Sequence, residues 1–399
     1  MKVLIIQGGI DRNLPTGEEV VISNDIKYLK KNGIDVIYEQ IKIPSSGWGS
    51  IVGKAGGLIW SFSNYKKVKS AIGKYKPDIL HFHTIVPYIS FSVIHAVSKM
   101  KVPVVQTLHN GRWLCVEGGY FRSNTFCDDC VNSYGWLGVV RGCGHGRAIS
   151  LLLFLNNYFV RRFGFLFNKI DHFIAVSEFT KKQHINSSFP KQKITVRNNG
   201  FNFTSLVSEV VINPLLKKEG IVFAGKVSVA KGALVLRYLI PRLNCTLKII
   251  GNGPELDMLK SYCIDKSFNH IEFFGKVDNN KAIEVIKNSI LTIVPSQCGD
   301  SFPTVAVESM AVGTPVLASN LGGLPDLIKK SGGGRLVQYD DNSKFLYEIE
   351  SLLSNQDELN KLAKTGMAYV KHNISLNKKG DELLAIYNHT IEEFKAGKK

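Results

Sequence analysis

The sequence predicts an α/β protein built of two doubly wound domains. Its 399 residues exceed one ordinary α/β domain and suffice for two. Short apolar, β-branched runs alternate with helical patterns, and runs that are apolar on both faces are typical of parallel strands covered by helices on each side. The alternation starts again once. We therefore expect an N-terminal domain over 1–205, a second domain over 206–372, and a C-terminal helix over 373–399 that packs on the first domain.

The expected strands fall into two series, separated by a loose stretch that ends near residue 219. The first series comprises Lys2–Gln7, Asp78–Thr84, Val102–Leu108, His172–Ser177 and Lys193–Arg197; the second comprises Ile221–Lys226, Thr246–Gly251, Ile271–Val277, Leu291–Ser296 and Pro315–Ser319. The helical patterns include Glu18–Lys31, Pro254–Tyr262, Asn280–Lys287, Thr304–Ala311 and Asn377–Glu393. Because doubly wound sheets bind ligands outside the carboxyl ends of their strands, we expect the functional site in a cleft between the domains.

Composition and charge narrow the class of protein. A hydrophobic fraction of 44% and a charged fraction of 21% are typical of a globular protein. The net charge is +17, and residues 40–170 hold sixteen Lys or Arg against four acids. This excess favours an anionic partner, such as nucleic acid, lipid headgroups or a phosphorylated substrate, although a solvated basic face is the alternative. No apolar run reaches the roughly 18 residues of a membrane span, and Met1–Gln7 reads as a strand rather than a signal peptide, so we expect a cytoplasmic protein.

The segment PSQCGDSFPTVAVESMAVGTPV, residues 295–316, carries the strongest functional signal. A strand ends at Ser296, a polar loop follows, and Pro303 is suited to the first turn of a helix. The free N–H groups of that turn can hold a phosphate. Glu308 follows among apolar neighbours, and a carboxylate there needs partners such as paired ribose hydroxyls. The alternative is an acid that caps the helix or meets a nearby lysine.

Lys226 and Lys231 follow the first strand of the second domain. A sugar diphosphate leaving group gains negative charge as its bond to the sugar breaks, and cations fixed beside it stabilise that transition state. Two surface lysines without a ligand are the alternative. We interpret the pair as a diphosphate site because the acidic segment of residues 295–316 belongs to the same predicted domain.

The segment 300–316 resembles the donor-site motif of glycosyltransferase family 4, the group 1 transferases, and the resemblance extends over most of the chain. It implies the GT-B fold, two Rossmann-like domains facing across a cleft, with a UDP- or GDP-sugar donor and transfer that retains anomeric configuration without a metal. Glu308 would hold the ribose, and Asp300 with Ser301, Phe302, Pro303 and Thr304 would face the transferred sugar and the diphosphate. The family usually has Glu at position 300 and Arg at position 226, so the donor sugar is open.

Further residues match the family by their positions relative to the expected strands and helices. Gly251 and Gly253 form a tight turn after the second strand of the second domain, and Gly275 and Val277 stand where the family chain passes the nucleobase. In the first domain, Gly17 opens the first long helix, and Thr16 is suited to cap it. Gly8 and Gly9 follow the first expected strand and are candidates for the same work as Gly17. His109 ends a strand on the cleft side, where the resemblance implies a functional histidine; for His81 and His83 we expect structural roles.

Four cysteines have the spacing C-x11-C-x2-C-x12-C: Cys115, Cys127, Cys130 and Cys143. Such a set can close a tetrahedral structural zinc site, whereas free reduced thiols or a redox pair are the alternatives. We expect no catalytic metal here.

The segment Ala148–Phe167 is apolar and aromatic, with arginines at its flanks. It serves either as core or as a contact with an anionic membrane surface. Family members often use lipid-linked acceptors, so the resemblance implies a saccharide or polyprenyl-diphosphate-linked acceptor, with surface polysaccharide assembly at the inner face of the plasma membrane. A GT-B nucleotide-sugar epimerase and a basic nucleic-acid-binding protein are the other hypotheses; we expect no nucleic acid partner.

Overall fold

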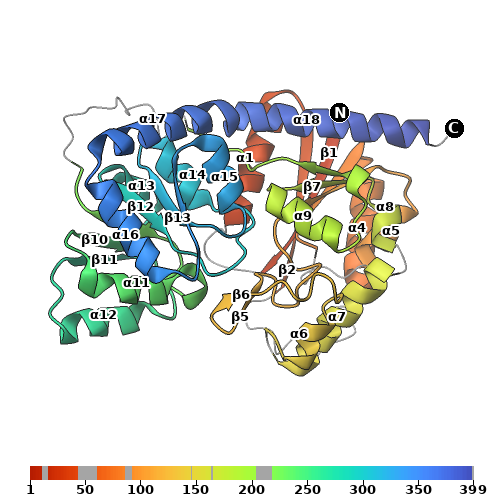
Figure 1. Ribbon diagram of the computed structural model, residues 1–399. Coiled ribbons are helices and arrows are strands. Elements are labelled where there is room, and N and C mark those ends of the chain that lie inside the picture. Colours follow the sequence, from red (N-terminus) through yellow and green to blue (C-terminus); the bar gives the residue numbers. More distant parts are fainter. Residues whose placement is uncertain are drawn as a thin grey trace. The chain divides into compact units, whose positions relative to one another are not determined.

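The computed structural model describes residues 1–10, 17–43, 61–85, 92–144, 146–162, 165–203 and 218–397. They form two compact units, each built on its own six-stranded parallel sheet (Figure 1). Unit 1 comprises Met1–Tyr120, Asp128–Phe201 and Leu376–Lys399, and unit 2 comprises Phe121–Cys127 and Asn202–Ser375. The predicted α/β class with two doubly wound sheets is confirmed. The expected boundary at residue 205 lies outside the described residues.

The sheet of unit 1 has the strand order β2-β1-β3-β4-β7-β8, and its strands are all parallel. Their bounds are β1 (Lys2–Ile10), β2 (Asp35–Ile43), β3 (Ile79–His83), β4 (Val104–Leu108), β7 (His172–Ala175) and β8 (Ile194–Val196). The order reverses between β1 and β3, so the switch point of this sheet lies at their carboxyl ends. Gly8 and Gly9, expected after the first strand, lie inside β1 and pair with Ile41 and Lys42.

The helices of unit 1 cover both faces of its sheet. They are α1 (Gly17–Lys31), α4 (Phe62–Tyr75), α5 (Ser92–Ser98), α6 (Trp136–Val140), α7 (Arg147–Arg162), α8 (Phe165–Lys169), α9 (Glu178–Asn186), the 3-10 turn η1 (Lys191–Lys193) and α18 (Leu376–Ala396). The last helix packs beside α1 on β1, where Leu383 and Tyr387 join the buried cluster that contains Ile5 and Leu29. A Cβ on Gly380 would lie 2.2 Å from the Tyr28 ring, so the close approach of α18 to α1 requires glycine.

The sheet of unit 2 has the order β11-β10-β9-β12-β13-β14, which is the order 3-2-1-4-5-6 of a dinucleotide-binding sheet. Its strands are β9 (Ile221–Ala224), β10 (Leu247–Ile250), β11 (Ile271–Gly275), β12 (Leu291–Val294), β13 (Val316–Ser319) and β14 (Gly334–Val337). A short hairpin, β5 (Phe121–Arg122) and β6 (Thr125–Phe126), groups with this unit, and Phe126 contacts Tyr339 edge-on.

The helices of unit 2 are α11 (Ala233–Leu239), α12 (Leu256–Asp265), α13 (Asn279–Lys287), α14 (Thr304–Ala311), α15 (Leu324–Ser331), α16 (Asn342–Leu353) and α17 (Gln356–Asn373), with 3-10 turns η2 (Val229–Lys231) and η3 (Ile240–Arg242). Side-chain caps fix several starts: Asp278 accepts from the Lys281 N–H, and Asn355 accepts from the Glu358 N–H. The core between sheet and helices is mainly aliphatic, with Ile221, Leu236 and Leu247 fully buried, and it includes Phe223 and Phe345.

Candidate functional site

The strand order of unit 2 reverses between β9 and β12, and the loops at this switch point hold the charged residues singled out from the sequence. β9 ends at Ala224 and leads into Lys226 and Lys231, whereas β12 ends at Val294 and leads into Asp300. The two loops touch, because the Gln297 N–H donates to the Ala230 carbonyl at 2.9 Å. A crevice outside the ends of such strands is the usual ligand site of this fold.

Lys231 and Asp300 form an ion pair between these two loops. Burial is the largest single influence and would lower the pKa of Lys231, but the Asp300 charge, the nearby Cys298 and the hydrogen bond to Asp300 together raise this pKa above its ordinary value. The other Asp300 oxygen accepts from the Ser296 hydroxyl at 3.0 Å, and the Cys298 thiol lies 3.6 Å from the oxygen that meets Lys231. Asp300 therefore holds the ammonium group of Lys231 in place and keeps it charged.

The loop after β13 fixes the backbone of the Asp300 loop. The Gly323 N–H donates to the Asp300 carbonyl at 2.7 Å. A Cβ on Gly322 would lie 2.5 Å from the same carbonyl, and one on Gly323 would lie 2.3 Å from the Ser301 carbonyl. Only glycine permits this approach, so the two glycines position the segment that carries Asp300 and Ser301.

Lys226 differs from Lys231 in its surroundings. Its side chain is exposed, and within the described ranges no acid pairs with it. The structure therefore does not bring Lys226 into the Lys231–Asp300 pair. It leaves a cation at the end of β9 that is available to a ligand.

Glu308 lies one turn inside α14, flanked by the buried residues Val307 and Ser309. Its carboxylate is half-buried, and none of the residues that the structure describes donates to it or pairs with it. Burial raises the pKa of Glu308 to about 7. An unsatisfied carboxylate is costly to keep, so its presence here indicates a ligand with hydroxyl donors.

The N-terminus of α14 follows directly on the Asp300 loop. Pro303 is buried at the cap position in extended conformation, and Ser301, Phe302 and Thr304 are half-buried. The first N–H groups of a helix have no partner inside it, and their dipole favours an anion. This segment therefore offers an anion site beside the Lys231–Asp300 pair.

The glycines at the carboxyl edge of unit 2 bring its backbone loops together. The Gly251 N–H donates to the Gly275 carbonyl at 2.7 Å, and a Cβ on Gly251, at φ +128°, would lie 1.8 Å from the Gly225 carbonyl. A Cβ on Gly253 would lie 2.1 Å from the Val227 carbonyl. Val277 follows β11 and packs against a buried cluster that includes Ile250. Gly251, Gly253, Gly275 and Val277 are all half-buried along this edge.

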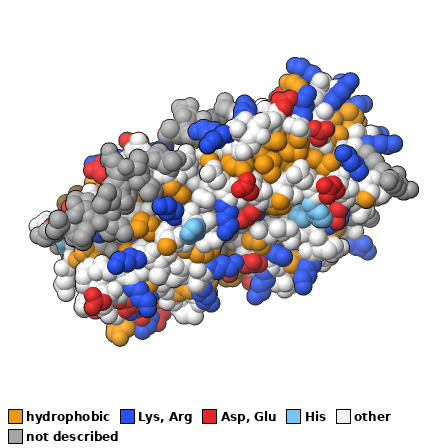
Figure 2. All heavy atoms as spheres, turned by 90° about the horizontal axis from the view of Figure 1, so that it is seen from above, with side chains coloured by type: hydrophobic (Ala, Val, Ile, Leu, Met, Phe, Trp, Pro, Cys, Tyr) orange, Lys and Arg blue, Asp and Glu red, His pale blue; other side chains and the backbone are white. Residues whose placement is uncertain are grey.

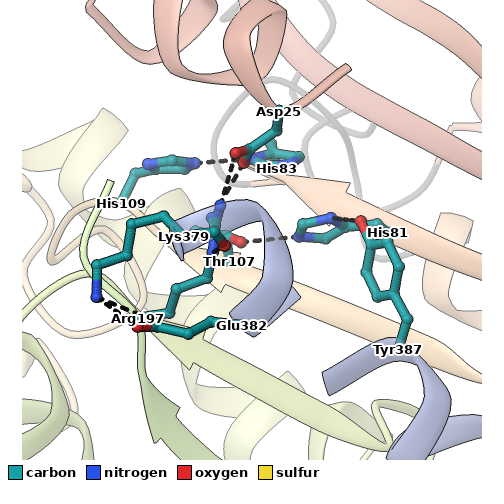
Figure 3. A network of polar contacts seen from close by, with 9 residues as sticks. All are labelled: Asp25, His81, His83, Thr107, His109, Arg197, Lys379, Glu382 and Tyr387. Atoms are coloured by element: carbon teal, nitrogen blue, oxygen red, sulfur yellow. Dashed lines mark hydrogen bonds and ion pairs between the residues drawn. The ribbon is translucent and has the colours of Figure 1, made fainter. Parts of the chain in front are cut away.

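In unit 1, histidines gather at the carboxyl ends of β3 and β4 (Figure 3). His83 Nδ1 lies 2.8 Å from His109 Nε2, and the two rings are stacked. His81 is bonded through both nitrogens, to Tyr387 at 2.6 Å and to Thr107 at 2.7 Å. Burial lowers the pKa of all three histidines, most strongly for His81 and His83, so they are neutral near pH 7. His83 Nε2 is buried without a partner among the described atoms.

The same close-up shows a buried ion pair that the sequence analysis missed (Figure 3). Arg197, after β8, meets Asp25 of α1 through two hydrogen bonds of 2.6 and 3.0 Å, with both side chains nearly inaccessible. The Arg197 Nε–H donates to the Lys379 carbonyl at 2.7 Å, and Lys379 pairs with Glu382. The pair ties α1 and β8 to α18. Arg197 ends the expected strand Lys193–Arg197, but Asp25 lies in the middle of the expected helix Glu18–Lys31, so no local signal indicated their pairing.

Gly17 opens α1, and Thr16, expected as its cap, lies outside the described residues. The next residue, Glu18, accepts a hydrogen bond from the Thr84 hydroxyl. Ligand atoms of Glu18, His83 and His109 lie within 4.8 Å of one another, an arrangement able to bind a cation. However, His83 and His109 already occupy one nitrogen each in their mutual hydrogen bond.

Three of the four clustered cysteines lie in unit 1. The Cys130 thiol donates to Cys115, which also accepts from the Glu117 and Gly118 N–H groups, and these contacts lower the pKa of Cys115 to about 7. The hydrogen bond to Cys115, with burial, raises the pKa of Cys130 well above its ordinary range. Cys143 acts electrostatically on Cys130. Cys127 follows β6, and none of the seven cysteines forms a disulfide.

Basic side chains are scattered over the one face drawn in Figure 2. On the face drawn in Figure 2, Lys and Arg side chains stand among neutral and hydrophobic ones, with acids between them. No helix among the described residues is long and apolar enough to cross a bilayer.

Comparison with known proteins identifies the class of enzyme. A family model for glycosyl transferases group 1 matches residues 211–368, and a model for glycosyltransferase family 4 matches residues 17–204. The Anabaena protein HepE, solved in complex with UDP, has a TM-score of 0.66 at 16% identity, covering 98% of this chain and 100% of that one. The chain is therefore a GT-B glycosyltransferase.

Sequence relatives narrow the class to a family. An uncharacterized glycosyltransferase of Methanocaldococcus jannaschii is 23% identical over 318 residues, which cover 80% of this chain and 77% of that protein. Phosphatidyl-myo-inositol mannosyltransferase of Mycolicibacterium smegmatis is 34% identical over 116 residues, or 28% of this chain and 30% of that protein. Because the two family models together span most of the sequence, the chain belongs to glycosyltransferase family 4, the group 1 transferases.

Proposed function

We propose that this protein transfers a sugar from a UDP- or GDP-sugar to a saccharide or lipid-linked saccharide, with retention of anomeric configuration and without a catalytic metal. The observation that carries the proposal is the Glu308 carboxylate on α14, which no described residue pairs with. This helix begins directly after the Asp300 loop, at the switch point of unit 2. A nucleotide sugar offers ribose hydroxyls to Glu308 and a diphosphate to Lys231.

The donor is bound through its ribose and its diphosphate. Glu308 accepts hydrogen bonds from two ribose hydroxyls, while N–H groups of Ser301, Phe302, Thr304 and Val305 face phosphate oxygens. The backbone edge made by Gly251, Gly253, Gly275 and Val277 admits the flat base close to the chain. The UDP bound to HepE supports a nucleotide at a site of this fold.

Lys226 and Lys231 neutralise the departing diphosphate. Negative charge on its bridging oxygen grows as the bond to the anomeric carbon breaks, so fixed cations lower the barrier more than they strengthen ground-state binding. Asp300 keeps Lys231 protonated and aimed. In this proposal its carboxylate also accepts from hydroxyls of the transferred sugar. Asp300 is one methylene shorter than the family's usual Glu.

His109 contributes a hydrogen-bond donor to the transferred sugar or a phosphate oxygen. A buried N–H without an acceptor is rarer than a buried lone pair without a donor, so we assign the unpartnered His83 Nε2 as unprotonated. His83 then donates from Nδ1 to His109 Nε2, which leaves the proton of His109 on Nδ1. Gly17 permits close backbone approach at the start of α1.

The chemical step follows from retention. The acceptor hydroxyl attacks the anomeric carbon on the face from which the diphosphate departs, the carbon–oxygen bond to the diphosphate breaks, and the hydroxyl proton passes to the leaving oxygen. No separate general base is assigned.

We further propose that the acceptor lies at an anionic membrane surface, at the inner face of the plasma membrane, in surface polysaccharide assembly. Exposed large side chains on α6 and α7 support this contact, and α7 has arginines at both ends: Trp136, Val140, Leu151 and Phe159, with Arg147 and Arg162. The substitutions Trp136→Ala with Leu151→Ala should release the protein from phosphatidylglycerol vesicles in sedimentation. Ile264→Ala, which removes an exposed side chain on α12, should not.

The function is tested by incubating the protein with a panel of nucleotide sugars, with and without lipid-linked saccharides, in excess EDTA. The proposal predicts an acceptor-dependent product whose new linkage has the anomeric configuration of the donor by NMR. An epimerised nucleotide sugar formed without acceptor, an inverted linkage, or activity that requires added metal would each contradict the corresponding part. Salt-sensitive DNA binding without turnover would contradict the whole.

A further inference from the structure

We infer that Tyr387, on the C-terminal helix α18, is a positioning residue for the proposed sugar transfer, because it holds through His81 the strand end that carries His109. Figure 3 shows Tyr387 reaching from α18 to the His81 ring. Both side chains are fully buried, so neither touches a ligand. The inference rests on the proposed function, in which His109 contacts the transferred sugar or a phosphate oxygen.

His81 joins the C-terminal helix to strand β4. Its Nδ1 lies 2.6 Å from the Tyr387 hydroxyl oxygen, and its Nε2 lies 2.7 Å from the Thr107 hydroxyl oxygen. Strands β3 and β4 are parallel neighbours in which His83 pairs with Thr107. Because residues two apart on a strand point to the same face, His81 and His83 share a face of the sheet with Thr107. The chain reaches His109 on that face two residues later.

His109 is held from two directions, and both begin at His81. Along the backbone, the hydrogen bond from His81 to Thr107 fixes the strand end two residues before His109. Through the side chains, the centroids of the His81 and His83 rings lie 4.1 Å apart, and His83 Nδ1 lies 2.8 Å from His109 Nε2. Since a close-packed interior transmits displacements, a change at His81 moves the His109 ring.

The Tyr387 hydroxyl also decides which nitrogen of His81 carries the proton. His81, whose pKa burial holds well below its ordinary value, is neutral and has one proton, whereas each hydroxyl beside it can donate or accept. A phenol is more acidic than an aliphatic alcohol, so we assign Tyr387 as the donor to Nδ1. His81 then donates from Nε2 to the Thr107 oxygen. Without the phenol hydroxyl, Nδ1 has no partner and the proton is no longer fixed on Nε2.

The docking of α18 on unit 1 does not depend on this hydroxyl. Tyr28 of α1 donates a second hydrogen bond to the helix, at Asp381, and the Tyr387 ring is packed in the apolar cluster between α1, α18 and the sheet. Phenylalanine keeps that ring in place. Removing the hydroxyl of Tyr387 alone should therefore leave α18 docked and change only the surroundings of His81.

Kinetics of the full chain test the inference. Tyr387→Phe should lower kcat roughly tenfold and change KM for the nucleotide sugar less than about twofold, because a misplaced His109 fails in the transition state more than in ground-state binding. The matched control Tyr28→Phe removes the other tyrosine hydroxyl bonded to α18 and should leave kcat within about twofold of wild type. In a His109→Ala background, Tyr387→Phe should lower kcat no further. A further loss in that double variant, or an equal loss in Tyr28→Phe, overturns the inference.

Nitrogen NMR of the imidazole rings provides a measurement that needs no turnover. In the wild type without ligand, His81 should be protonated on Nε2 and His109 on Nδ1, each as a single tautomer. Tyr387→Phe should mix the tautomers of both rings, whereas Tyr28→Phe should not. If Tyr387→Phe does not fold, Thr107→Val, which removes the other hydrogen bond of His81, should produce the same mixture.

The NMR result separates this inference from the proposed function. Unchanged His109 resonances in Tyr387→Phe overturn the inference even if the wild type transfers sugar. Changed resonances in a protein that transfers no sugar support the coupling of Tyr387 to His109 and contradict the proposed function.

Discussion

Replacing Glu308 with glutamine removes one negative charge and leaves the size of the side chain nearly unchanged. In the free protein this carboxylate is half-buried and no described residue satisfies it, and burial raises its pKa from 4.5 to about 7. The substitution should therefore stabilise the fold while weakening nucleotide binding. This opposition distinguishes a binding residue from a structural one.

The magnitude follows from the pKa. At 1.36 kcal/mol for each pH unit, ionising Glu308 in the folded state costs roughly 3 kcal/mol, and partial solvent access reduces this to about 1–2 kcal/mol. Between about pH 4.5 and 7 the unfolded chain is ionised while the folded one stays protonated, so wild-type stability falls as pH rises through this window. Glu308→Gln should gain nothing below pH 4.5 and its full advantage above pH 7.

Binding should change in the opposite direction. Hydrogen bonds to a charged acceptor contribute about 1.5–3 kcal/mol, so nucleotide affinity should fall roughly 10- to 150-fold in Glu308→Gln. Because the ionised carboxylate is the better acceptor, wild-type affinity should also decline below pH 7. The variant, which does not titrate there, should lose this dependence.

Thermal unfolding from pH 5 to 8.5 without ligand, together with calorimetric titration of UDP and GDP, measures both effects. Glu272→Gln, an exposed residue of β11, is the matched control and should alter neither. Equal stability of Glu308→Gln and wild type at every pH would refute the burial argument. Unchanged nucleotide affinity would refute the assignment of Glu308 to the ribose.

Three further substitutions test other parts of the account. Lys231→Ala should lower kcat/KM about 10²- to 10³-fold with little effect on folding, and Lys231→Arg should recover part of the lost kcat/KM. Equal rates in wild type and Lys231→Ala would exclude a role of Lys231 at the leaving group. Gly251 has φ +128°, and Gly251→Ala places a Cβ 1.8 Å from the Gly225 carbonyl, so this variant should lower the free energy of unfolding by about 2–4 kcal/mol. Gly73→Ala, in open space on α4, should stabilise the protein slightly. A higher denaturant midpoint for Gly251→Ala than for Gly73→Ala would contradict this expectation. Asp25→Asn should cost about 3–5 kcal/mol in urea unfolding because it leaves Arg197 buried without its partner, and a cost below 1 kcal/mol would show that water reaches the pair.

Much of the fold could be predicted because apolar periodicity is a local signal. The helix Thr304–Ala311 was predicted with its observed bounds, and the ten expected strands correspond to strands of the two sheets. The two sheet strands missed, β2 and β14, are both edge strands. Polar residues interrupt both faces of β2, at Asp35, Glu39, Gln40 and Lys42, and β14 begins with Gly334 and Arg335, so neither shows a continuous apolar run.

The site was predictable only where its residues share one segment. Asp300 and Glu308 stand eight residues apart, and their loop and helix could be recognised together. Asp25 and Arg197 lie 172 residues apart, and no local pattern indicates that they meet. The contact between His83 and His109 depends likewise on the parallel pairing of β3 with β4, which periodicity does not specify.

The binding of a nucleotide sugar by the loops of unit 2 is the central claim, and one titration tests it most directly. Calorimetry of the wild type with the nucleotide sugar that most raises its melting temperature should give saturable binding at one site per chain, and Glu308→Ala should weaken it at least tenfold. If no nucleotide sugar binds, or if the variant binds it as tightly as the wild type, the switch point of unit 2 is not the donor site.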